Sequence, residues 1–461
     1  MHEFSLRPLL LPCLSAMLLA GCALGPDYVR PKIDVPAAYK EDGRWKSAQP
    51  EDASPRAAWW DIYRDPQLDR LMDTLNKQSP TIEQAEAQYR LARAQLDQAE
   101  ASLYPTLGAT ASNSHGVSAA GDATSNSYAL GLNASWEVDL WGAVRRAVEG
   151  GKAKEAESVA QLEAVRLSSQ TQLATAYLQL VVADVQLKQL QQSEALLLQT
   201  LQLTRNQYAA GIVGDDSVAA AESQWKTAQA ATVDKALTRA QLEHSIAAAL
   251  GMAPAGFSLP ASAQLPYLPQ IPAGIPSALL ERRPDIAAAE RGVAVANAEI
   301  GIAKTALYPS LTLSASGGYK GSSFADWVSL PNRVWSVGSQ LAMTLFDGGA
   351  LRAQVKQAEA TYDSTVASYR ATVLSAFQAV EDNLVAQSHL HEEADMSDKA
   401  LAAAQRSETI TLNQYHAGTV SFVNVLTAQN TRITAEQSLW NIKNRQYAAS
   451  VSLIAAIGGK W

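Results

Sequence analysis

The feature that most constrains this chain is a long internal repeat. Asn-Gln-Tyr-Ala-Ala-Gly-Ile-Val at 206–213 returns as Asn-Gln-Tyr-His-Ala-Gly-Thr-Val at 413–420, which is 207 positions later (413 − 206). Leu-Tyr-Pro at 103–105 returns at 307–309, an offset of 204 (307 − 103). A repeat of about two hundred residues is far longer than a solenoid unit. The chain therefore contains a duplicated domain, and we expect the two copies to pack as pseudo-equivalent halves.

The prolines mark the boundaries of the copies. None of the 19 prolines falls within 106–253 or 332–461, whereas they are dense between Pro254 and Pro284. A proline inside a helix costs about 3 kcal/mol, so the proline-free runs permit very long helices. We predict a signal peptide, an N-terminal segment, a first repeat, a Pro-rich connector and a second repeat that includes the C-terminus, over 1–21, 22–80, 81–251, 252–283 and 284–461.

Apolar residues in each copy follow a heptad. In the first copy one alternating 3/4 spacing, with Glu194 and Thr204 as its polar members, joins Leu173, Ala176, Leu180, Ala183, Leu187, Leu190, Leu197, Leu201 and Tyr208. A single helix over 142–208 would span about 100 Å. Shorter helices are expected over 81–103 and, after a glycine turn, over 218–250. In the second copy the heptad includes Val423, Leu426, Trp440 and Tyr447. These patterns predict long antiparallel coiled coils.

Between the helices the apolar period changes to two. Apolar residues alternate with small or polar ones over 128–140 and 335–345, and more briefly around Leu107 and Leu311. Strands with one apolar and one small polar face suit a membrane barrel with a wet interior, although a half-buried soluble sheet gives the same pattern. The Gly/Ser-rich links at 113–126 and 317–332 are expected to be surface loops.

The number of strands constrains assembly. Four strands per chain cannot close a barrel, since single-chain outer-membrane barrels need at least eight. Open sheet edges are not tolerated in lipid because unpaired backbone groups cost several kcal/mol each. If the strands span a membrane, several chains must share one barrel. These arguments leave open whether two, three or four chains do so.

The N-terminus predicts export and lipidation. The apolar stretch from Leu9 to Leu19 is too short for a transmembrane helix and fits a signal-peptide core. It ends in Leu-Ala-Gly-Cys, which resembles the bacterial lipobox and makes Cys22 the lipidated first residue of the mature chain. The alternative is an ordinary secretory signal with a chance cysteine. Cys13 would leave with the signal, so no disulfide is possible within the mature chain.

Charge and motifs exclude several classes of function. The formal net charge of −8 argues against nucleic-acid binding. The chain has no G-x-S-x-G, Walker or H-E-x-x-H pattern, so we expect no catalytic residues and no cofactor. His389 and His391 are two residues apart on a helix and do not share a face, so we expect no metal site.

Several short motifs together carry a family resemblance. They are the lipobox at Cys22, Trp-Trp-Asp at 59–61, Asp-Pro-Gln-Leu at 65–68, Leu-Leu-Glu-Arg-Arg-Pro-Asp-Ile at 279–286, Phe-Asp-Gly-Gly at 346–349 and the Tyr-x-Ala-Gly turns at 208–211 and 415–418. With them, nearly the whole mature chain resembles the TolC-like outer-membrane efflux proteins, in particular their NodT-type lipoprotein branch.

That resemblance implies a mainly α fold with membrane β-strands. It implies a homotrimer in the bacterial outer membrane, with a shared twelve-stranded barrel, a long periplasmic α-helical tunnel and lipid bound at the anchor. The function implied is a passive export duct for small molecules, opened by a periplasmic adaptor protein and driven by an inner-membrane pump. The alternative is a lipid-anchored periplasmic coiled-coil scaffold or adaptor without a barrel. The duplicated strand pairs favour the duct, because a scaffold has no need of them.

The resemblance also implies two kinds of site. The turns would be periplasmic tips at which the adaptor docks, formed by Gly211, Ile212, Val213, Gly418, Thr419 and Val420. Relatives commonly carry an aspartate six residues beyond the turn glycine, where it narrows the closed aperture.

This chain departs from the aspartate pattern. Ser217 and Asn424 occupy the expected positions, and Thr427 occupies a further one. Asp215 and Asp216 could supply the missing charge, since in a trimer they would bring six carboxylates near one ring and attract cations. The alternative is that both are solvated residues in the first turn of a helix, where aspartate is favourable.

Overall fold

The computed structural model describes residues 23–33, 58–117, 124–269 and 282–459. It divides into two compact units. Unit 1 contains residues up to 33, 88–159 and 288–371, and unit 2 contains 34–87, 160–287 and 372–461. The units are therefore not the two repeats, because each takes corresponding parts of both copies. The predicted N-terminal segment, 22–80, is likewise divided between them.

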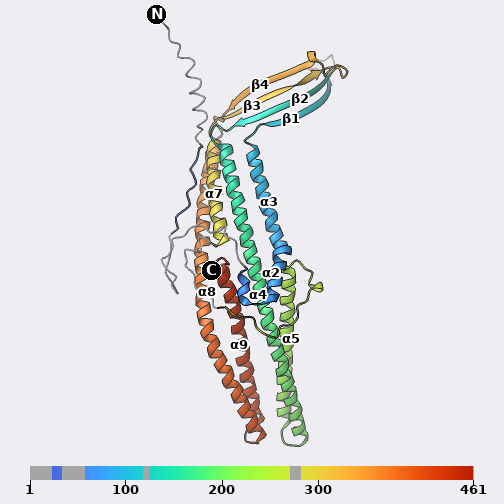
Figure 1. Cartoon of the computed structure of the whole chain (residues 1–461), viewed down its shortest axis with the longest axis vertical. Coiled ribbons are helices and arrows are strands. Elements are labelled where there is room, and N and C mark those ends of the chain that lie inside the picture. The colour runs from blue at the N-terminus through green and yellow to red at the C-terminus, as the bar shows by residue number, and fades with distance from the viewer. Residues whose placement is uncertain (1–22, 34–57, 118–123, 270–281, 460–461) are drawn as a thin grey trace. The chain divides into compact units, whose positions relative to one another are not determined.

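The element order repeats along the chain (Figure 1). After the short helices η1 (Trp59–Tyr63) and α2 (Pro66–Gln78), the first copy consists of α3 (Pro80–Ala101), β1 (Thr106–Val117), β2 (Thr124–Val138), α4 (Ala143–Ala209) and α5 (Asp215–Ala249). The turn η2 (Pro254–Gly256) follows. The second copy consists of α7 (Pro284–Thr305), β3 (Ser310–Gly321), η3 (Leu330–Asn332), β4 (Arg333–Ala342), α8 (Ala350–His416) and α9 (Phe422–Ala456).

The bounds of these elements repeat at the same offsets as the duplicated sequence motifs. α8 and α9 begin 207 positions after α4 and α5 (350 − 143 and 422 − 215), while α7 and β3 begin 204 positions after α3 and β1 (284 − 80 and 310 − 106). The predicted fold class, a tandem repeat that is mainly helical with four strands, is confirmed. Within the described ranges, no helix is both long enough and apolar enough to cross a membrane.

Glycines in a left-handed conformation end the helices of both copies. Gly211 and Gly418 have φ of 75° and 71°, and Gly251 and Gly458 have φ of 73° and 87°. At the end of α4 the amide of Gly211 donates to Tyr208 O (2.9 Å) and that of Ile212 to Gln207 O (2.9 Å). This is the Schellman arrangement, in which glycine is favoured because it has no Cβ. The other three ends bond in the same way.

Unit 1 contains one antiparallel sheet in the order β1-β2-β3-β4 (Figure 1). The strands are longer than their apolar pattern indicated, so the prediction of loops over 113–126 and 317–332 is wrong at the ends. β1 continues to Val117, β2 begins at Thr124 and β3 continues to Gly321. These ends consist mostly of glycine and polar residues, so pairing with the neighbouring strand extends each strand where side-chain hydrophobicity gives no signal.

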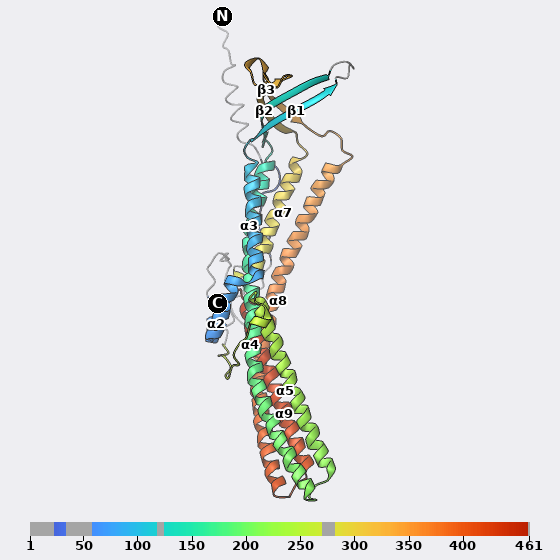
Figure 2. The same ribbon diagram turned by 90° about the vertical axis from the view of Figure 1, so that its right-hand side faces the viewer.

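Unit 2 contains parts of α4 and α8 together with α5 and α9, which Figure 2 shows side by side. The predicted heptad is buried in most places: Leu173, Leu180 and Leu201 are at most 1% exposed. It is wrong near the turns, where Tyr208 is 49% and Val423 59% exposed. Leu201, one heptad before Tyr208, is fully buried, so drift of the seam by about 20° per heptad is too small to explain this change. Tyr208 and Val423 are instead the second-last residue of α4 and the second residue of α9.

Three other predicted boundaries are wrong by a few residues. α3 ends at Ala101 rather than 103, α5 begins at Asp215 rather than 218, and β4 ends at Ala342 rather than 345. Each lies where the apolar period fades, and hydrogen bonding decides where an element begins or ends.

The glycines at the helix ends should lose different amounts of stability when alanine replaces them. At Gly211 no atom lies within 4 Å of a built Cβ, so Gly211→Ala carries only the left-handed backbone cost, about 1 kcal/mol. At Gly251 the Cβ would lie 2.9 Å from Gln78 O and from Pro80 Cδ, so Gly251→Ala adds about 1–3 kcal/mol of overpacking. Thermal unfolding followed by circular dichroism should show the larger loss for Gly251→Ala. Equal losses would contradict this reading of the turns.

Candidate functional site

The sheet of unit 1 has two chemically different faces. Directly paired residues of antiparallel strands lie on the same face. The register pairs Leu107 with Ala134, Trp136 with Leu313, and Leu311 with Leu341, so all six belong to one face. Apart from Ser339, which pairs with Leu313, the residues that complete its central part are also apolar or glycine: Ala109, Ala111, Leu130, Leu132, Val138, Ala315, Gly317 and Val337.

The opposite face is small and polar. It carries Thr106, Gly108, Thr110, Gly131, Asn133, Ser135, Thr312, Ser314, Ser316, Gly338 and Gln340. Its only charged residues within the described strands are Glu137 and Lys320. An apolar face against lipid and a small polar face against water is the pattern of an outer-membrane barrel strand.

Each outer strand of this sheet has one side without a hydrogen-bonded neighbour among the described strands. β1 pairs only with β2 and β4 only with β3 among the described strands. Several apolar residues near these edges are exposed: Leu107 is 73%, Trp335 74% and Leu341 66% exposed. The sheet is therefore incomplete as a membrane structure in one chain.

The six predicted docking residues lie at the turns between the paired helices. Gly211, Ile212 and Val213 join α4 to α5, and Gly418, Thr419 and Val420 join α8 to α9. Ile212 is 70% exposed, while Val213 and Val420 are half-buried. The two turns have the same pattern of backbone hydrogen bonds, so the two predicted docking sites have equivalent backbone conformations.

Side chains from both copies meet just inside the turns. Leu201, Ala221, Phe422 and Val425 form a buried cluster, against which Tyr415 and Trp225 pack. The Tyr415 hydroxyl donates to Gln207 Oε1, so a hydrogen bond also joins the two repeats here.

Further along the helices, the Trp440 indole donates to Gln189 Oε1 at 2.7 Å and the Gln224 amide to Asn430 Oδ1 at 3.1 Å. The helix pairs are thus joined through one small apolar cluster and several polar contacts. The periodicity of the sequence did not identify these polar contacts.

The candidate aperture residues lie in the first two turns of α5 and α9. Asp215 and Asp216 are exposed in the first turn of α5, and Ser217 is half-buried. Asn424 and Thr427 are exposed, and the Thr427 hydroxyl donates to Val423 O at 2.9 Å. The first turn of α9 carries no acidic residue. The acidic charge at these helix starts therefore belongs to the first repeat alone.

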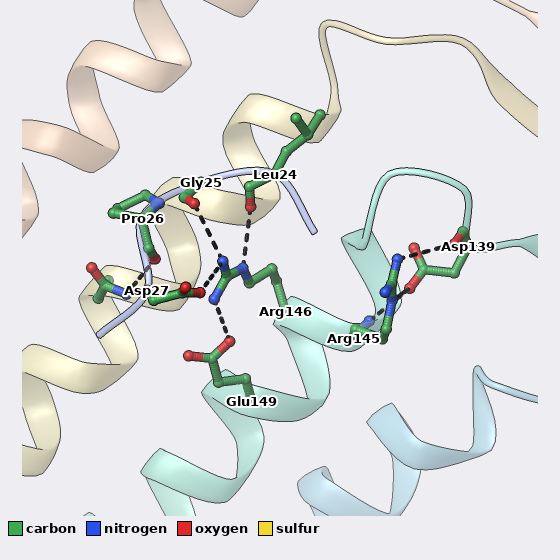
Figure 3. Close-up of polar contacts among 9 residues, drawn as sticks. Leu24, Gly25, Pro26, Asp27, Asp139, Arg145, Arg146 and Glu149 are labelled. Carbon is green, nitrogen blue, oxygen red and sulfur yellow. Dashed lines mark hydrogen bonds and ion pairs between the residues drawn. The ribbon is translucent and has the colours of Figure 1, made fainter. Parts of the chain in front are cut away.

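Cys22, the predicted point of lipidation, lies outside the described residues, but the segment that follows it is held by several contacts (Figure 3). The guanidinium of Arg146 on α4 donates to Leu24 O (3.1 Å) and Gly25 O (3.3 Å), and pairs with Asp27 (2.9 Å) and Glu149 (2.7 Å). The side chain of Arg146 is 4% exposed. Burial alone lowers its pKa, but the hydrogen bonds to Glu149 and Asp27 outweigh burial and the pKa is raised.

Other contacts fix the same segment. The Leu24 amide donates to Trp141 O (3.0 Å), and Asn297 on α7 donates to Pro26 O (2.9 Å). Gly25 lies so close to α7 that a Cβ on it would be 2.6 Å from the Gly301 Cα. The periodicity of the sequence did not identify Arg146. The signal was a break in the duplication, since the residue 207 positions after Arg146 is Ala353.

Two of the motifs that carry the resemblance have a structural role in unit 2. Trp59 and Trp60 are buried, and the Trp59 indole donates to Gln170 Oε1 (3.2 Å). Asp65 caps α2 by accepting from the amides of Gln67 and Leu68. In the described ranges, no three His, Cys, Asp or Glu side chains are grouped so that they could hold a metal ion.

Comparison with known proteins identifies the class. Residues 71–252 and 275–459 match the sequence profile of the family described as outer membrane efflux protein, and the chain belongs to that family. It is 31% identical over 470 residues to the pyoverdine export outer membrane protein OpmQ of Pseudomonas aeruginosa, covering 97% of this chain and 96% of OpmQ.

Two further relatives match over almost as much of the chain. Nodulation protein T of Rhizobium leguminosarum bv. trifolii is 30% identical, covering 92% of this chain and 91% of that protein. The solved outer-membrane channel OprN superposes with a TM-score of 0.85 at 28% identity, over 95% of this chain and all of OprN's. The predicted resemblance is confirmed, and the function it implied is that of an outer-membrane efflux channel protein.

Removing the Arg146 side chain should free the segment after Cys22. Hydrogen bonds to a charged group contribute about 1.5–3 kcal/mol, and 1.4 kcal/mol corresponds to tenfold. Hydrogen exchange of the Leu24 amide in the purified protein should therefore quicken about tenfold in Arg146→Ala. The neighbouring Arg145→Ala removes the same charge from a side chain paired with Asp139, and is the matched control. Unchanged exchange in Arg146→Ala would show that other contacts hold the segment.

The two faces of the sheet should respond oppositely to a charge. An arginine on the lipid side of a barrel costs about 2–4 kcal/mol at the bilayer midplane. Leu132→Arg should therefore reduce insertion into lipid vesicles, measured by flotation, at least about tenfold. Asn133→Arg, one residue along on the polar face, should insert like the wild type. Equal insertion of the two variants would contradict the assignment of the faces.

Proposed function

We propose that three copies of this chain form an export duct in the outer membrane, with one barrel of twelve strands and a helical tunnel in the periplasm. The observation that carries the proposal is the four-stranded sheet with one apolar face, one small polar face and two open edges. Closing those edges with further copies leaves no unpaired backbone in lipid. The choice of three copies rests on the family resemblance.

The tips support docking of a periplasmic adaptor protein. They present the same backbone twice per chain, and the exposed side chain of Ile212 offers an adaptor an apolar contact. The chain has no nucleotide-binding motif, so the energy for export comes from a partner, an inner-membrane pump that the adaptor connects to the duct.

Lipid on Cys22 would anchor each copy. The contacts of Leu24 to Asp27 support an anchor that is held rather than loosely linked, because only Ala23 separates Cys22 from the first of them. Mass spectrometry of the N-terminal peptide tests this part of the proposal. An unmodified Cys22, or a mature chain that begins elsewhere, would contradict it.

Asp215 and Asp216 are proposed to form the charged ring of the aperture. Their exposure in the first turn of α5 and the uncharged character of Asn424 and Thr427 support the first repeat as the source of that charge. The same exposure is consistent with two solvated residues that favour a helix N-terminus. Selectivity measurements separate the two alternatives.

Planar-bilayer recording from the detergent-extracted protein tests the duct and the ring together. The wild type should form discrete, cation-preferring channels. Changing both residues, Asp215→Ala with Asp216→Ala, should lower the cation preference by roughly twofold at 0.1 M salt and less at 1 M, where charges are screened within about 3 Å.

Asp234→Ala, an exposed aspartate further along α5, is the matched control and should leave selectivity unchanged. If the double substitution leaves channel selectivity unchanged, the protein still forms a duct but Asp215 and Asp216 do not form its charged ring. A folded monomer without channels would support the scaffold instead.

A further inference from the structure

A cavity of about 340 Å³ lies among three helices of unit 2. Its lining comes from α4 and α5 of the first repeat and α9 of the second, the three helices that run alongside one another in Figure 2. The apolar part of the lining includes Leu190, Leu426 and Ile433, which are half-buried, and the buried Trp440. Ligand pockets in proteins measure about 300–1,000 Å³ and are lined in this way, so the cavity has room for a small organic molecule.

One polar side chain of the lining is buried without a partner. Gln186 on α4 is 7% exposed, and its amide makes no hydrogen bond with any of the described residues. Buried side-chain amides in native proteins are almost always hydrogen-bonded, because leaving one unpaired is costly. The amide has both a donor and an acceptor, so a bound group that offers both, such as another amide or a hydroxyl, would satisfy it. Water could also do so, but it would leave the apolar walls without a partner.

Two further amides leave donors at the cavity. The oxygen of Gln189 accepts from the Trp440 indole at 2.7 Å, and the oxygen of Asn430 accepts from the Gln224 amide at 3.1 Å. The nitrogens of Gln189 and Asn430 make no hydrogen bond within the described part of the chain, and each carries two donor hydrogens. The cavity therefore presents several amide groups that can orient a polar molecule.

The charge of the lining argues against an ionic ligand. Glu436 is the only charged residue among those that line the cavity, and its carboxylate pairs with Arg432 at 2.7 Å. Arg432 also pairs with Glu408 on α8 at 2.7 Å, and all three side chains are less than 20% exposed. An anion would be repelled by the second glutamate of this group, while a cation would compete with an ion pair that already exists. An uncharged molecule loses the least when it leaves water for this site.

We propose that the cavity binds a small, uncharged aromatic molecule that carries an amide or hydroxyl group. The ring packs against the apolar side chains, where the Trp440 indole favours an aromatic partner. The polar group bonds to Gln186. Because the walls come from both repeats, the bound molecule holds α9 against α4 and α5. The inference goes beyond the proposed duct and does not depend on the number of copies, because the cavity is formed within one chain.

Three probes that share one ring system test the class of ligand. Calorimetric titration of the full-length, detergent-extracted protein should show saturable binding of naphthamide. Naphthoate and naphthamidine have nearly the same shape and carry a negative and a positive charge. Both should bind at least about tenfold more weakly, which is the usual effect of burying a polar group without a matched partner. Titration into detergent alone corrects each measurement for partition into micelles.

A substitution at Gln186 locates the site. Gln186→Leu keeps a side chain of similar size and removes the amide, so binding of naphthamide should weaken about tenfold. The unfolding temperature without probe should not fall, because the amide has no protein partner to lose. Gln191→Leu, at an exposed glutamine further along α4, is the matched control and should bind like the wild type.

Each other result would overturn the inference. Absence of naphthamide binding, or equal binding by Gln186→Leu, would show that the cavity is not the site. Equal or tighter binding of either charged probe would refute the uncharged class. A lower unfolding temperature of Gln186→Leu without probe, with Gln191→Leu unchanged, would assign the amide a structural role. None of these results bears on the duct, which is tested separately by channel recording.

Discussion

The structure depends on one constraint: backbone amides and carbonyls in lipid must be hydrogen-bonded within protein. A sheet of four strands in which the outer two are open satisfies this for its interior and fails at β1 and β4. The alternation of side chains assigns the two faces, with residues such as Leu132 toward lipid and Asn133 toward water. A chain of this family therefore forms its membrane structure only when several copies assemble, because its own four strands are too few to close a barrel.

Duplication explains how one chain supplies both sides of such an assembly. Each repeat contributes a first helix (α3 or α7), two strands, one long helix and one shorter returning helix, and the compact units combine corresponding parts of both repeats. Contacts such as the hydrogen bond from Tyr415 to Gln207 join the two repeats within one chain. Sequence differences between equivalent residues of the two repeats then determine where the repeats are not equivalent in the assembly.

The sequence determined element types better than their ends. Heptads in proline-free runs identified α4 and α9, and the alternation around Leu130 and Leu311 identified the strands, because burial on one face leaves a period. The duplication then implied α8 as the counterpart of α4. That signal vanished where neither face is apolar, as at Ser112 to Gly116, so the strand ends were missed. The turns were found from the repeated motif that ends in Gly211 and Gly418, and glycine is favoured there because a positive φ is costly for other residues. Arg146 was missed because a single arginine in a helix has no periodic signal, and its role depends on a segment more than a hundred residues away.

The departures from the repeat identify positions where one copy performs a task that the other does not. Arg146 stands where the second copy has Ala353, and only the first copy has an N-terminal segment to hold. Asp215 stands where the second copy has Phe422, which is buried in the cluster inside the turns, so the same position supplies charge in one repeat and packing in the other. A buried phenylalanine and an exposed aspartate cannot exchange roles, because each requires the environment that the other lacks. The tip is thus chemically threefold rather than sixfold in a trimer, although its backbone is nearly the same in both repeats.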